Sequence, residues 1–313
     1  MRAIVVFMLG LGLAAALQAA PDPATLDYRL SARALDDGVY VVEGANADFD
    51  RANGCNIINT GFLVGRDGVL VVNTGPSRRY GEQLRALIAR TTAKPVTAVI
   101  HLNLHPDYFL GSQAFADVPR YATPATLEGM RAEARAYEDN LYRLCGDWMK
   151  GTEALLPDRV LAPGDTIALA GRQIAVREFK GHTASDLVLR DEASGTLFAG
   201  GLVFAERVPT TPHARVPEWL ASLDALAAQP MRTLVPSHGP VAQGLAGIDQ
   251  TRRYLRWLEG SLASAARRGL EVSELLAQPV PAEFRAWAAF DTEYVRNIVH
   301  LYPAHEARSL QSR

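Results

Sequence analysis

Residues 95–102, PVTAVIHL, are the segment that most restricts the folds open to this chain. Nearly all of them are apolar or β-branched, which predicts a strand that is buried on both faces. Such a strand needs one packed layer above it and another below it. It leads into the turn NLHPDY (103–108), which has the rhythm of a metal-binding turn but carries Asn103 and Tyr108 where imidazoles would be expected. The turn is therefore a metal site, a metal site with fewer ligands, or the remains of one.

Strand pairs and helices alternate twice along the rest of the chain. The pattern predicts a strand over 38–44, a hairpin over 60–76 with its turn at 66–68, and an amphipathic helix over 77–91. A second round follows, with a helical stretch over 125–150, strands within 159–200, a helix over 218–229 and a strand within 231–240. This alternation predicts two sheets packed together with helices outside, in an α/β or α+β fold.

The length of 313 residues permits one large domain or two small ones. The sequence contains neither a low-complexity linker nor a repeat of fixed period. We therefore predict that residues 21–313 form a single domain with a helical C-terminal extension from about residue 247. The net charge is -2, from 32 Lys and Arg against 34 Asp and Glu, so no basic excess indicates nucleic acid as a partner.

Residues 1–20 are typical of a secretory signal peptide. Arg2 precedes the apolar run IVVFMLGLGLAAAL, and small residues follow it before Pro21. The run is shorter than the roughly 20 residues that span a membrane, and an uncleaved anchor is the alternative. Cleavage after Ala19 or Ala20 predicts a periplasmic or secreted protein. No later segment has 18 consecutive apolar residues, so we expect no membrane span after cleavage.

Cys55 and Cys145 are the only cysteines in the chain. An oxidising compartment would permit a disulfide between them. The alternative is a pair of buried, unpaired thiols that act as small hydrophobic residues. The sequence leaves both possibilities open.

Three of the seven histidines stand where a predicted strand meets a turn: His105, His182 in FKGHTASD and His238 in VPSHGP. A neighbouring glycine allows a tight backbone turn at the second and third of them. Asp107 adds a carboxylate at the first junction. Three imidazoles and one carboxylate are a plausible ligand set for zinc. A lone His in a glycine-flanked turn is, however, more often a cap or a surface residue.

The ordered motifs NLHPDY (103–108), GHT (181–183), LFAGG (197–201) and SHG (237–239) resemble the metallo-β-lactamase superfamily. The resemblance extends from about residue 35 to 242 and implies a four-layer αβ/βα sandwich. In that superfamily a His-x-His-x-Asp-His turn, a later Gly-His, an Asp after a strand and a final Gly-His gather one or two zinc ions. Four segments are similar to a secreted branch, the quinoprotein relay system zinc metallohydrolases: YVVEGAN, GCNIINTGF, NTGPSRRYGEQLRALI and NLHPDYF. That branch is associated with periplasmic pyrroloquinoline-quinone (PQQ) dehydrogenase systems.

The chain departs from the superfamily's pattern at three positions of the metal centre. Asn103 stands in place of the first His of the turn, Tyr108 in place of the His after the Asp, and Gly201 in place of the bridging Asp. Neither zinc site then keeps the three protein ligands that a catalytic zinc usually has. A two-zinc centre is therefore not expected.

One zinc is the expectation that remains. The resemblance implies that its ligands are His105, Asp107, His182 and His238. Asp107 would be the catalytic residue, because it would orient a zinc-bound hydroxide or accept its proton.

Three further residues are candidates for contacting the substrate: Asn103, Tyr108 and His213. His213 could instead replace a missing ligand, or it could be a solvated loop residue. His101 is either a substitute ligand or a packed strand residue, and His300 and His305 receive no role.

The sequence therefore favours a periplasmic mono-zinc hydrolase that acts on an ester, amide or thioester carbonyl, with a quinoprotein dehydrogenase system as a possible partner. The alternative is a non-catalytic binding protein with a degenerate metal site, which would bind a small molecule or a quinoprotein partner. β-Lactamase activity is disfavoured because Tyr108 and Gly201 fall at the reacting centre.

Overall fold

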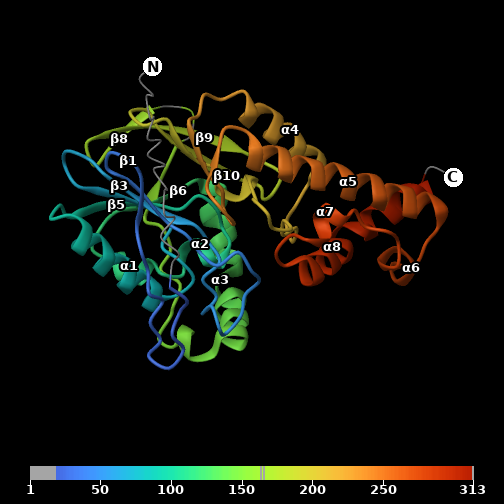
Figure 1. The fold of residues 1–313 in the computed structure, drawn as a ribbon, viewed down its shortest axis with the longest axis horizontal. Coiled ribbons are helices and arrows are strands. Elements are labelled where there is room, and N and C mark those ends of the chain that lie inside the picture. Colours follow the sequence, from blue (N-terminus) through green and yellow to red (C-terminus); the bar gives the residue numbers. More distant parts are fainter. Residues whose placement is uncertain (1–18, 163, 165, 312–313) are drawn as a thin grey trace, which may run out of the picture.

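The predicted strand over 95–102 is β5 (Val96–Ile100), an interior strand of a seven-stranded sheet (Figure 1). The computed structural model describes residues 19–162, 164 and 166–311, so the predicted signal peptide lies outside the described residues except for its last two positions. β5 is parallel to both of its neighbours, β4 and β6. The order across the sheet is β1 (Arg33–Asp36), β2 (Val39–Val42), β3 (Thr60–Val64), β4 (Val69–Val72), β5, β6 (Arg120–Ala122) and β7 (Arg159–Val160).

The second sheet comes from the second round of strands and has six of them among the described residues. Its only parallel pair is β11 with β12, and its other neighbours are antiparallel. The order across the sheet is β13 (Ala242–Gln243), β12 (Thr233–Val235), β11 (Thr196–Phe198), β10 (Asp186–Asp191), β9 (Arg172–Phe179) and β8 (Thr166–Leu169).

Successive side chains of β5 point into two different layers, as expected for a strand buried on both faces. Val99 packs outward in a cluster that includes α1 (Arg78–Thr91) and α3 (Pro124–Cys145). Ala98 and Ile100 pack inward, in a cluster shared with the second sheet.

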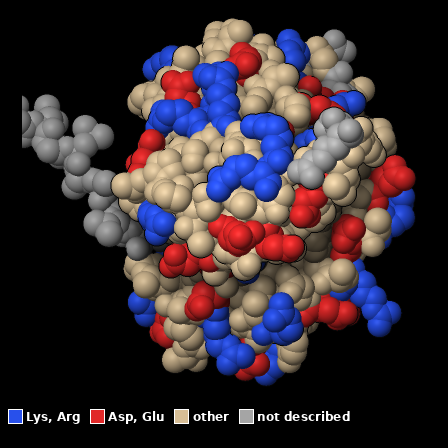
Figure 2. Space-filling model, turned by 90° about the vertical axis from the view of Figure 1, so that its right-hand side faces the viewer, with Lys and Arg blue, Asp and Glu red and all other residues tan. Residues whose placement is uncertain are grey.

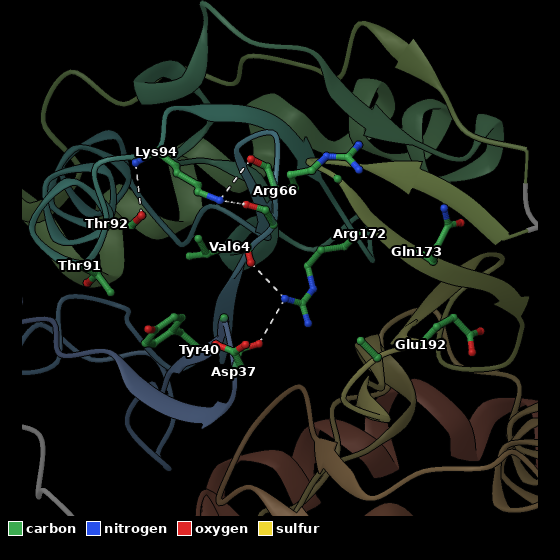
Figure 3. A pocket seen from close by; sticks show the side chains of 14 residues that line it. Asp37, Tyr40, Val64, Arg66, Thr91, Thr92, Lys94, Arg172, Gln173 and Glu192 are labelled. Atoms are coloured by element: carbon green, nitrogen blue, oxygen red, sulfur yellow. Dashed lines mark hydrogen bonds between the residues drawn. The ribbon is translucent and has the colours of Figure 1, made fainter.

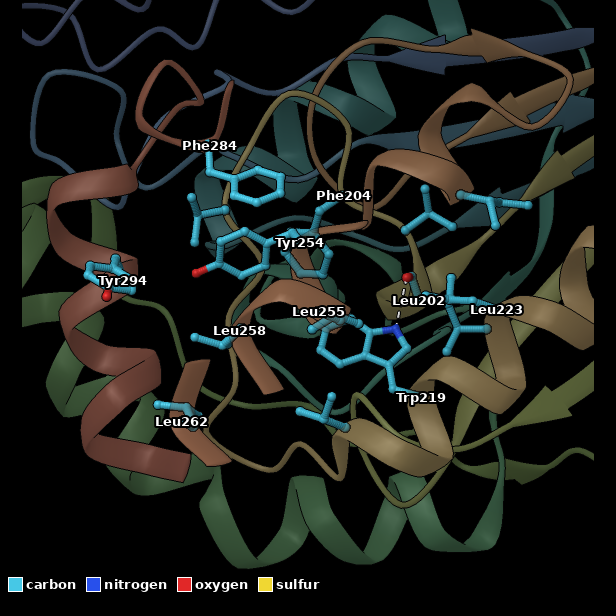
Figure 4. Close-up of a cluster of buried hydrophobic side chains, with 14 of the residues drawn as sticks. Leu202, Phe204, Trp219, Leu223, Tyr254, Leu255, Leu258, Leu262, Phe284 and Tyr294 are labelled. Carbon is cyan, nitrogen blue, oxygen red and sulfur yellow. Dashed lines mark hydrogen bonds between the residues drawn. The ribbon is translucent and has the colours of Figure 1, made fainter. Parts of the chain in front are cut away.

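The second sheet is also buried on both faces: its inner face packs against the first sheet and its outer face packs against helices. Phe198 of β11 faces the first sheet, whereas Leu197 faces α4 (Val216–Ala227) and α5 (Ala246–Arg268). In that outer core the indole of Trp219 donates a hydrogen bond to the Leu202 carbonyl at 2.9 Å (Figure 4). Helices thus cover the outer face of each sheet, and the predicted four-layer αβ/βα sandwich is confirmed.

The C-terminal region is helical, and its first helix begins at Ala246, close to the predicted residue 247. Leu255, Leu258 and Leu262 of α5 lie on one face at helical spacing and are fully buried. The remaining helices are α6 (Val272–Leu276), α7 (Ala282–Arg285) and α8 (Phe290–Gln311). Figure 1 shows this region reaching away from the sheets, with α8 beside α5.

The surface of the C-terminal region carries charges of both signs, which are intermixed over the face shown in Figure 2. Several of them are paired, such as Arg253 with Glu283 and Arg252 with Asp224. Within the described part of the chain, no helix is long and apolar enough to cross a membrane.

Cys55 and Cys145 form a disulfide, which settles the question that the sequence left open. It joins the loop before β3 to the last residue of α3, across a sequence separation of 90 residues. Closing so long a loop restricts the unfolded chain, which in the chain-entropy view stabilises the folded state by about 4.6 kcal/mol.

Candidate functional site

The turn after β5 carries His105 and Asp107 into the start of a short helix, α2 (Pro106–Phe109). Pro106 occupies the first helical position, where its fixed φ is suitable and its missing N–H is not needed. The Tyr108 N–H donates to the His105 carbonyl at 3.0 Å and closes the turn. Both His105 and Asp107 are buried.

Asp107 and His238 lie side by side, although 131 residues separate them in the sequence. The Nδ1 of His238 lies 2.8 Å from the Ile57 carbonyl, which can only accept, so Nδ1 carries the proton. The unprotonated Nε2 then lies 3.6 Å from Asp107 Oδ2. An imidazole lone pair and a carboxylate oxygen are thus presented together. Metal-bound histidines commonly have this kind of backbone partner.

His105 and His182 are also neighbours, with ring centroids 4.8 Å apart and planes nearly perpendicular. His105 Nε2 is hydrogen-bonded to Nδ1 of His213 at 3.0 Å. His182 and His238 both pack against the ring of Phe204, at centroid distances of 5.5 and 4.9 Å. The structure therefore places His105 beside His182 and Asp107 beside His238, and it places His213 against His105.

Asp186 is a carboxylate of this site that the sequence reasoning missed. Its Oδ1 lies 3.1 Å from His182 Nδ1 and accepts a hydrogen bond from the Asn103 side-chain amide at 2.5 Å. Its Oδ2 accepts from the Thr183 N–H at 2.9 Å. The available signal was the four-residue spacing between His and Asp in GHTASD, at the point where β10 begins.

Gly201 lies in the short helix η3 (Gly200–Leu202), directly against this cluster. A Cβ at Gly201 would lie 2.0 Å from His182 Nδ1 and 2.8 Å from Asp186 Oδ1. Contacts this short are not tolerated, so position 201 has no room for a side chain while His182 and Asp186 stay in place.

Asn103 and Tyr108, which were predicted to contact substrate, both lie beneath the site. The Asn103 side-chain oxygen accepts from the His105 N–H at 3.0 Å, and its amide nitrogen donates to Asp186. Tyr108 is packed between the sheets, and its hydroxyl makes no hydrogen bond of good geometry within the described chain. Neither side chain lines the cavity described below.

His101 is a packed strand residue. Its Nδ1 lies 3.1 Å from the Tyr108 carbonyl and its Nε2 lies 3.1 Å from the Ser112 hydroxyl. Both ring nitrogens are thereby occupied, and burial lowers the pKa of His101 to about 4. The ring is therefore neutral and committed to the fold.

A cavity of about 390 Å³ opens above the imidazoles and is walled by α3 and α8. Its floor contains His105, Asp107 and His238, and His213 and Thr210 lie at its edge. From α3 it receives Glu133, Tyr137, Asn140, Arg143 and Leu144, and from α8 it receives Glu293, Arg296 and His300. The wall from α8 was not predicted, because nothing in a helical pattern tells which distant loop the helix will cover.

The buried position of the floor shifts its titrations. Burial raises the pKa of the Asp107 carboxyl to about 6. Burial also holds the pKa values of His105 and His238 well below the usual range for histidine. These imidazoles are therefore neutral at physiological pH, which is the form that ligates metals and accepts protons.

A second and larger hollow, of about 770 Å³, lies at the opposite end of the strands (Figure 3). It is bordered by the hairpin turns and by the segment between α1 and β5. Its cations are engaged: Lys94 donates to the Gly65 and Arg66 carbonyls, and Arg172 donates to the Val64 carbonyl and to Asp191. None of the predicted site residues lines it.

The sequence profile of the metallo-β-lactamase superfamily matches residues 53–238, more than half of the chain. The chain belongs to the metallo-β-lactamase superfamily. Solved structures agree in fold: a metallo-β-lactamase from Pontibacter korlensis has a TM-score of 0.57 at 23% identity, and the metallo-β-lactamase IND-7 has 0.59 at 19%. Each alignment covers 72% of this chain. It covers 99% of the Pontibacter korlensis protein and 98% of IND-7.

Two curated members of other kinds are also similar. A linear primary-alkylsulfatase from Pseudomonas sp. (strain ATCC 19151) is 21% identical over 275 residues, or 75% of this chain. The match spans 52% of the alkylsulfatase, about half its length. The acyl-coenzyme A thioesterase MBLAC2 of Bos taurus is 25% identical over 231 residues, which make up 65% of this chain and 77% of the thioesterase.

Members of the superfamily usually bind zinc, which raises the question of whether the side chains at this site could coordinate that ion. The donor set suits zinc in kind, since neutral imidazoles and a carboxylate are its usual nitrogen and oxygen ligands. The arrangement is only partly suited: among the described residues, no three His, Cys, Asp or Glu side chains form a group that could hold a metal ion. Asp107 and His238 are placed together, whereas His105 and His182 are directed to protein partners.

The superfamily match ends at residue 238, before the helices that follow. The α8 wall of the cavity, with Glu293, Arg296 and His300, therefore lies outside the matched region. The chemistry of the floor comes from the part shared with the superfamily, and one wall of the binding space does not.

Proposed function

We propose that this protein is a metallo-β-lactamase-fold hydrolase that works with one zinc ion and cleaves an ester or thioester in the cavity between α3 and α8. The ion would be held by His105, Asp107, His182 and His238. The observation that carries the proposal is the pairing of Asp107 with the unprotonated Nε2 of His238 at 3.6 Å on the cavity floor. Superfamily membership supplies the second support.

Zinc, when bound, supplies a water of lowered pKa and polarises the bond to be cleaved. The chain's own residues orient the ligands and the attacking water, and they exclude bulk water. The backbone carbonyl of Ile57 fixes the His238 ring, and the buried Asp107 carboxylate beside it would orient the attacking water. Burial of the floor keeps bulk water from the reacting atoms.

The walls indicate the kind of substrate. Tyr137 and Leu144 offer apolar surface, while Arg143, whose guanidinium donates to the neutral Asn140 side chain, offers a cation. A substrate with an apolar part and an anionic group fits such a cavity. The two curated relatives are named for a sulfate ester and a thioester, which supports an ester-type bond as the target.

The proposal places the mature protein in the periplasm or outside the cell, with a quinoprotein dehydrogenase system as its partner. The signal-like residues 1–20 support export, and so does the Cys55–Cys145 disulfide, because such crosslinks persist in oxidising compartments. The partner rests on the resemblance of the early motifs alone. Co-purification with a PQQ dehydrogenase from periplasmic extract would support it, and no enrichment over a disulfide-containing control protein would contradict it.

The test of the hydrolase is metal content together with turnover. Protein purified without chelator should contain one zinc per chain, and it should hydrolyse a thioester or ester from a panel that includes a sulfate ester. His182→Ala should lose both. His305→Gln is the matched control, because His305 is a buried histidine that pairs with Glu259 away from the cavity, and it should keep both.

One observation favours the second candidate, a non-catalytic binding protein. His105 and His182 are each hydrogen-bonded to another side chain of the protein, His213 and Asp186 respectively, so the pocket is self-consistent without an ion. If zinc-replete protein contains no zinc and turns over nothing in the panel, the binding protein replaces the hydrolase as the conclusion.

A further inference from the structure

We propose that the C-terminal helices contain a second binding site, which takes a small aromatic anion in a pocket between α5, α6 and α8. The pocket has a volume of about 440 Å³. None of the described residues that line it also lines the cavity of the proposed active site. All of them follow residue 238, where the superfamily match ends. The site is therefore separate from the proposed hydrolase chemistry.

The α5 side of the pocket is a helix face with small side chains. Its members recur at three- and four-residue spacing and are Trp257, Gly260, Ser261, Ser264 and Ala265. A Cβ at Gly260 would meet nothing within 4 Å. Glycine inside a helix is destabilising relative to alanine, and no close packing of the described chain requires it here. The small side chains therefore leave room for a ligand on this face of α5.

The floor of the pocket is aromatic. The rings of Trp257 on α5 and Tyr294 on α8 lie with their centroids 5.7 Å apart. Phe284 packs against Trp257 at 5.1 Å, and Phe290 stacks on Tyr294 at 5.2 Å. Aromatic rings attract one another in offset and edge-to-face arrangements. A ligand ring in the pocket would extend this cluster.

Tyr294 also provides a polar group without a partner. Its side chain is 95% buried, being 5% exposed, yet its hydroxyl makes no hydrogen bond to the described part of the chain. Buried tyrosine hydroxyls usually have a partner. The hydroxyls of Ser261 and Ser264 likewise make no hydrogen bond with any described residue. Three hydroxyls at one pocket are thus available to a ligand acceptor.

The charge of the pocket favours an anion. Arg256 and Arg268 stand at the two ends of the α5 face, and the described lining contains no Asp or Glu. Arg268 donates to the neutral Gln278 side chain at 3.4 Å, and Arg256 lies 3.8 Å from Asp224 in an exposed, loose pair. Both guanidinium groups can therefore bind a carboxylate, which matches their geometry. The cavity of the proposed active site, by contrast, has three carboxylates in its lining.

The first experiment is calorimetric titration of the full, disulfide-bonded protein with 2,6-naphthalenedicarboxylate. This probe has an aromatic body and a carboxylate at each end. 2,6-Naphthalenedimethanol is the matched neutral probe, with the same rings. One dicarboxylate should bind per chain, and the dimethanol should bind at least about 10-fold more weakly, because hydrogen bonds to charged groups contribute that much or more. Equal affinities, or no binding of the dicarboxylate at millimolar concentration, would overturn the proposed site.

The second experiment locates the bound probe with variants of α5. Gly260→Leu should abolish binding, because its side chain fills the pocket, and it should not lower the denaturation midpoint, because leucine favours a helix. Arg268→Gln should weaken binding by about 10-fold. Arg253→Gln is the matched control, since Arg253 lies on the same helix, pairs with Glu283 and does not line the pocket. Wild-type affinity in folded Gly260→Leu would place the probe elsewhere and contradict the proposal.

Tyr294→Phe tests the buried hydroxyl with the ring kept in place. The variant should fold as the wild type does and bind the dicarboxylate about 5-fold more weakly, the usual effect of losing one hydrogen bond. An unchanged affinity would count against a ligand that accepts from Tyr294. These measurements need neither zinc nor turnover. A hydrolase without affinity for the dicarboxylate would contradict only the second site, and a protein that binds it without hydrolysing any ester would contradict only the proposed function.

Discussion

The two hollows at opposite ends of the strands differ in size and in the use of their polar groups. β5 begins beside the larger one, near Lys94, and ends at the turn that forms the floor of the smaller one. The larger hollow has about 770 Å³ and the smaller about 390 Å³. In the larger, Arg172 and Lys94 are bound to carboxylate or carbonyl oxygens of the fold. In the smaller, Asp107 and His238 Nε2 face each other at 3.6 Å, too far for a hydrogen bond.

The difference shows that volume is a poor guide to chemistry in this molecule. Polar groups that already have hydrogen-bond partners in the protein stabilise the fold. A nitrogen or oxygen whose lone pair has no such partner remains available to bind a ligand. Changes at the smaller hollow should therefore affect function, and changes at the larger one should affect stability.

The largest effect is expected from His238→Ala. His238 Nε2 is a proposed zinc ligand, so its loss should reduce kcat/KM by more than about 100-fold. That is more than the roughly 10- to 100-fold loss that usually follows removal of a residue that hydrogen-bonds to a ligand. The measurement is turnover of the best substrate in the ester and thioester panel, with zinc content determined on the same sample. Full activity in a folded His238→Ala protein would remove the smaller hollow from the reaction.

Arg172→Ala should be the most damaging change at the larger hollow. Asp191 is fully buried, and removing its partner leaves an uncompensated carboxylate, which costs about 3 kcal/mol or more of unfolding free energy. Urea denaturation measures this loss. Activity per folded molecule should equal that of the wild type, and a selective loss of activity at unchanged stability would reverse the division between the hollows.

His101 lies beneath the smaller hollow and should give a pH-dependent stability. Burial lowers its folded pKa to about 4, against about 6.5 when unfolded, so between these values the unfolded chain binds the extra proton. Its contribution is therefore complete above pH 6.5 and is lost as the pH falls, by about 2 kcal/mol between pH 7 and 5. Comparing unfolding free energies of wild type and His101→Gln over this range isolates the effect. Parallel curves would show that His101 does not cause it.

The smallest effect is expected from Lys94→Ala. Its ammonium donates to two carbonyls at the rim of the larger hollow, and a partly exposed contact of this kind contributes about 1 kcal/mol or less. Neither kcat nor KM should change. A rise in KM would mean that the larger hollow binds substrate after all.

The fold followed from the sequence because its signals are local and repeated. The doubly buried strand at 96–100 and the hairpin around residues 66–68 each predicted their own layer correctly. Of the four predicted ligands, His105 lies beside His182 and Asp107 lies beside His238, but no three of them form a group that could hold a metal ion among the described residues, so the ligand set stays a prediction. The disulfide was left open because spacing alone does not show which thiols approach each other.

The rest depends on distances that no pattern encodes. Asp186 stands at the polar start of a strand in the sequence, and its contacts with Asn103 and His182 appear only in the structure. Tyr108 and Asn103 were predicted at the surface of the pocket, yet the packing of the sheets turns both beneath it. The α8 wall comes from a helix whose sequence is ordinary. Tertiary placement, and not residue type, decides these cases.

The crosslink between Cys55 and Cys145 has a practical consequence for anyone who makes this protein. Cys55 is two residues from Ile57, whose carbonyl holds His238, and Cys145 adjoins Leu144 in the α3 wall. The disulfide thus joins the loop that holds His238 to the end of α3, which forms one wall of the smaller hollow. Material expressed in a reducing cytoplasm will lack that bond, and we expect it to be looser at both places. Folding the chain under oxidising conditions is the first requirement for an assay whose negative result can be believed.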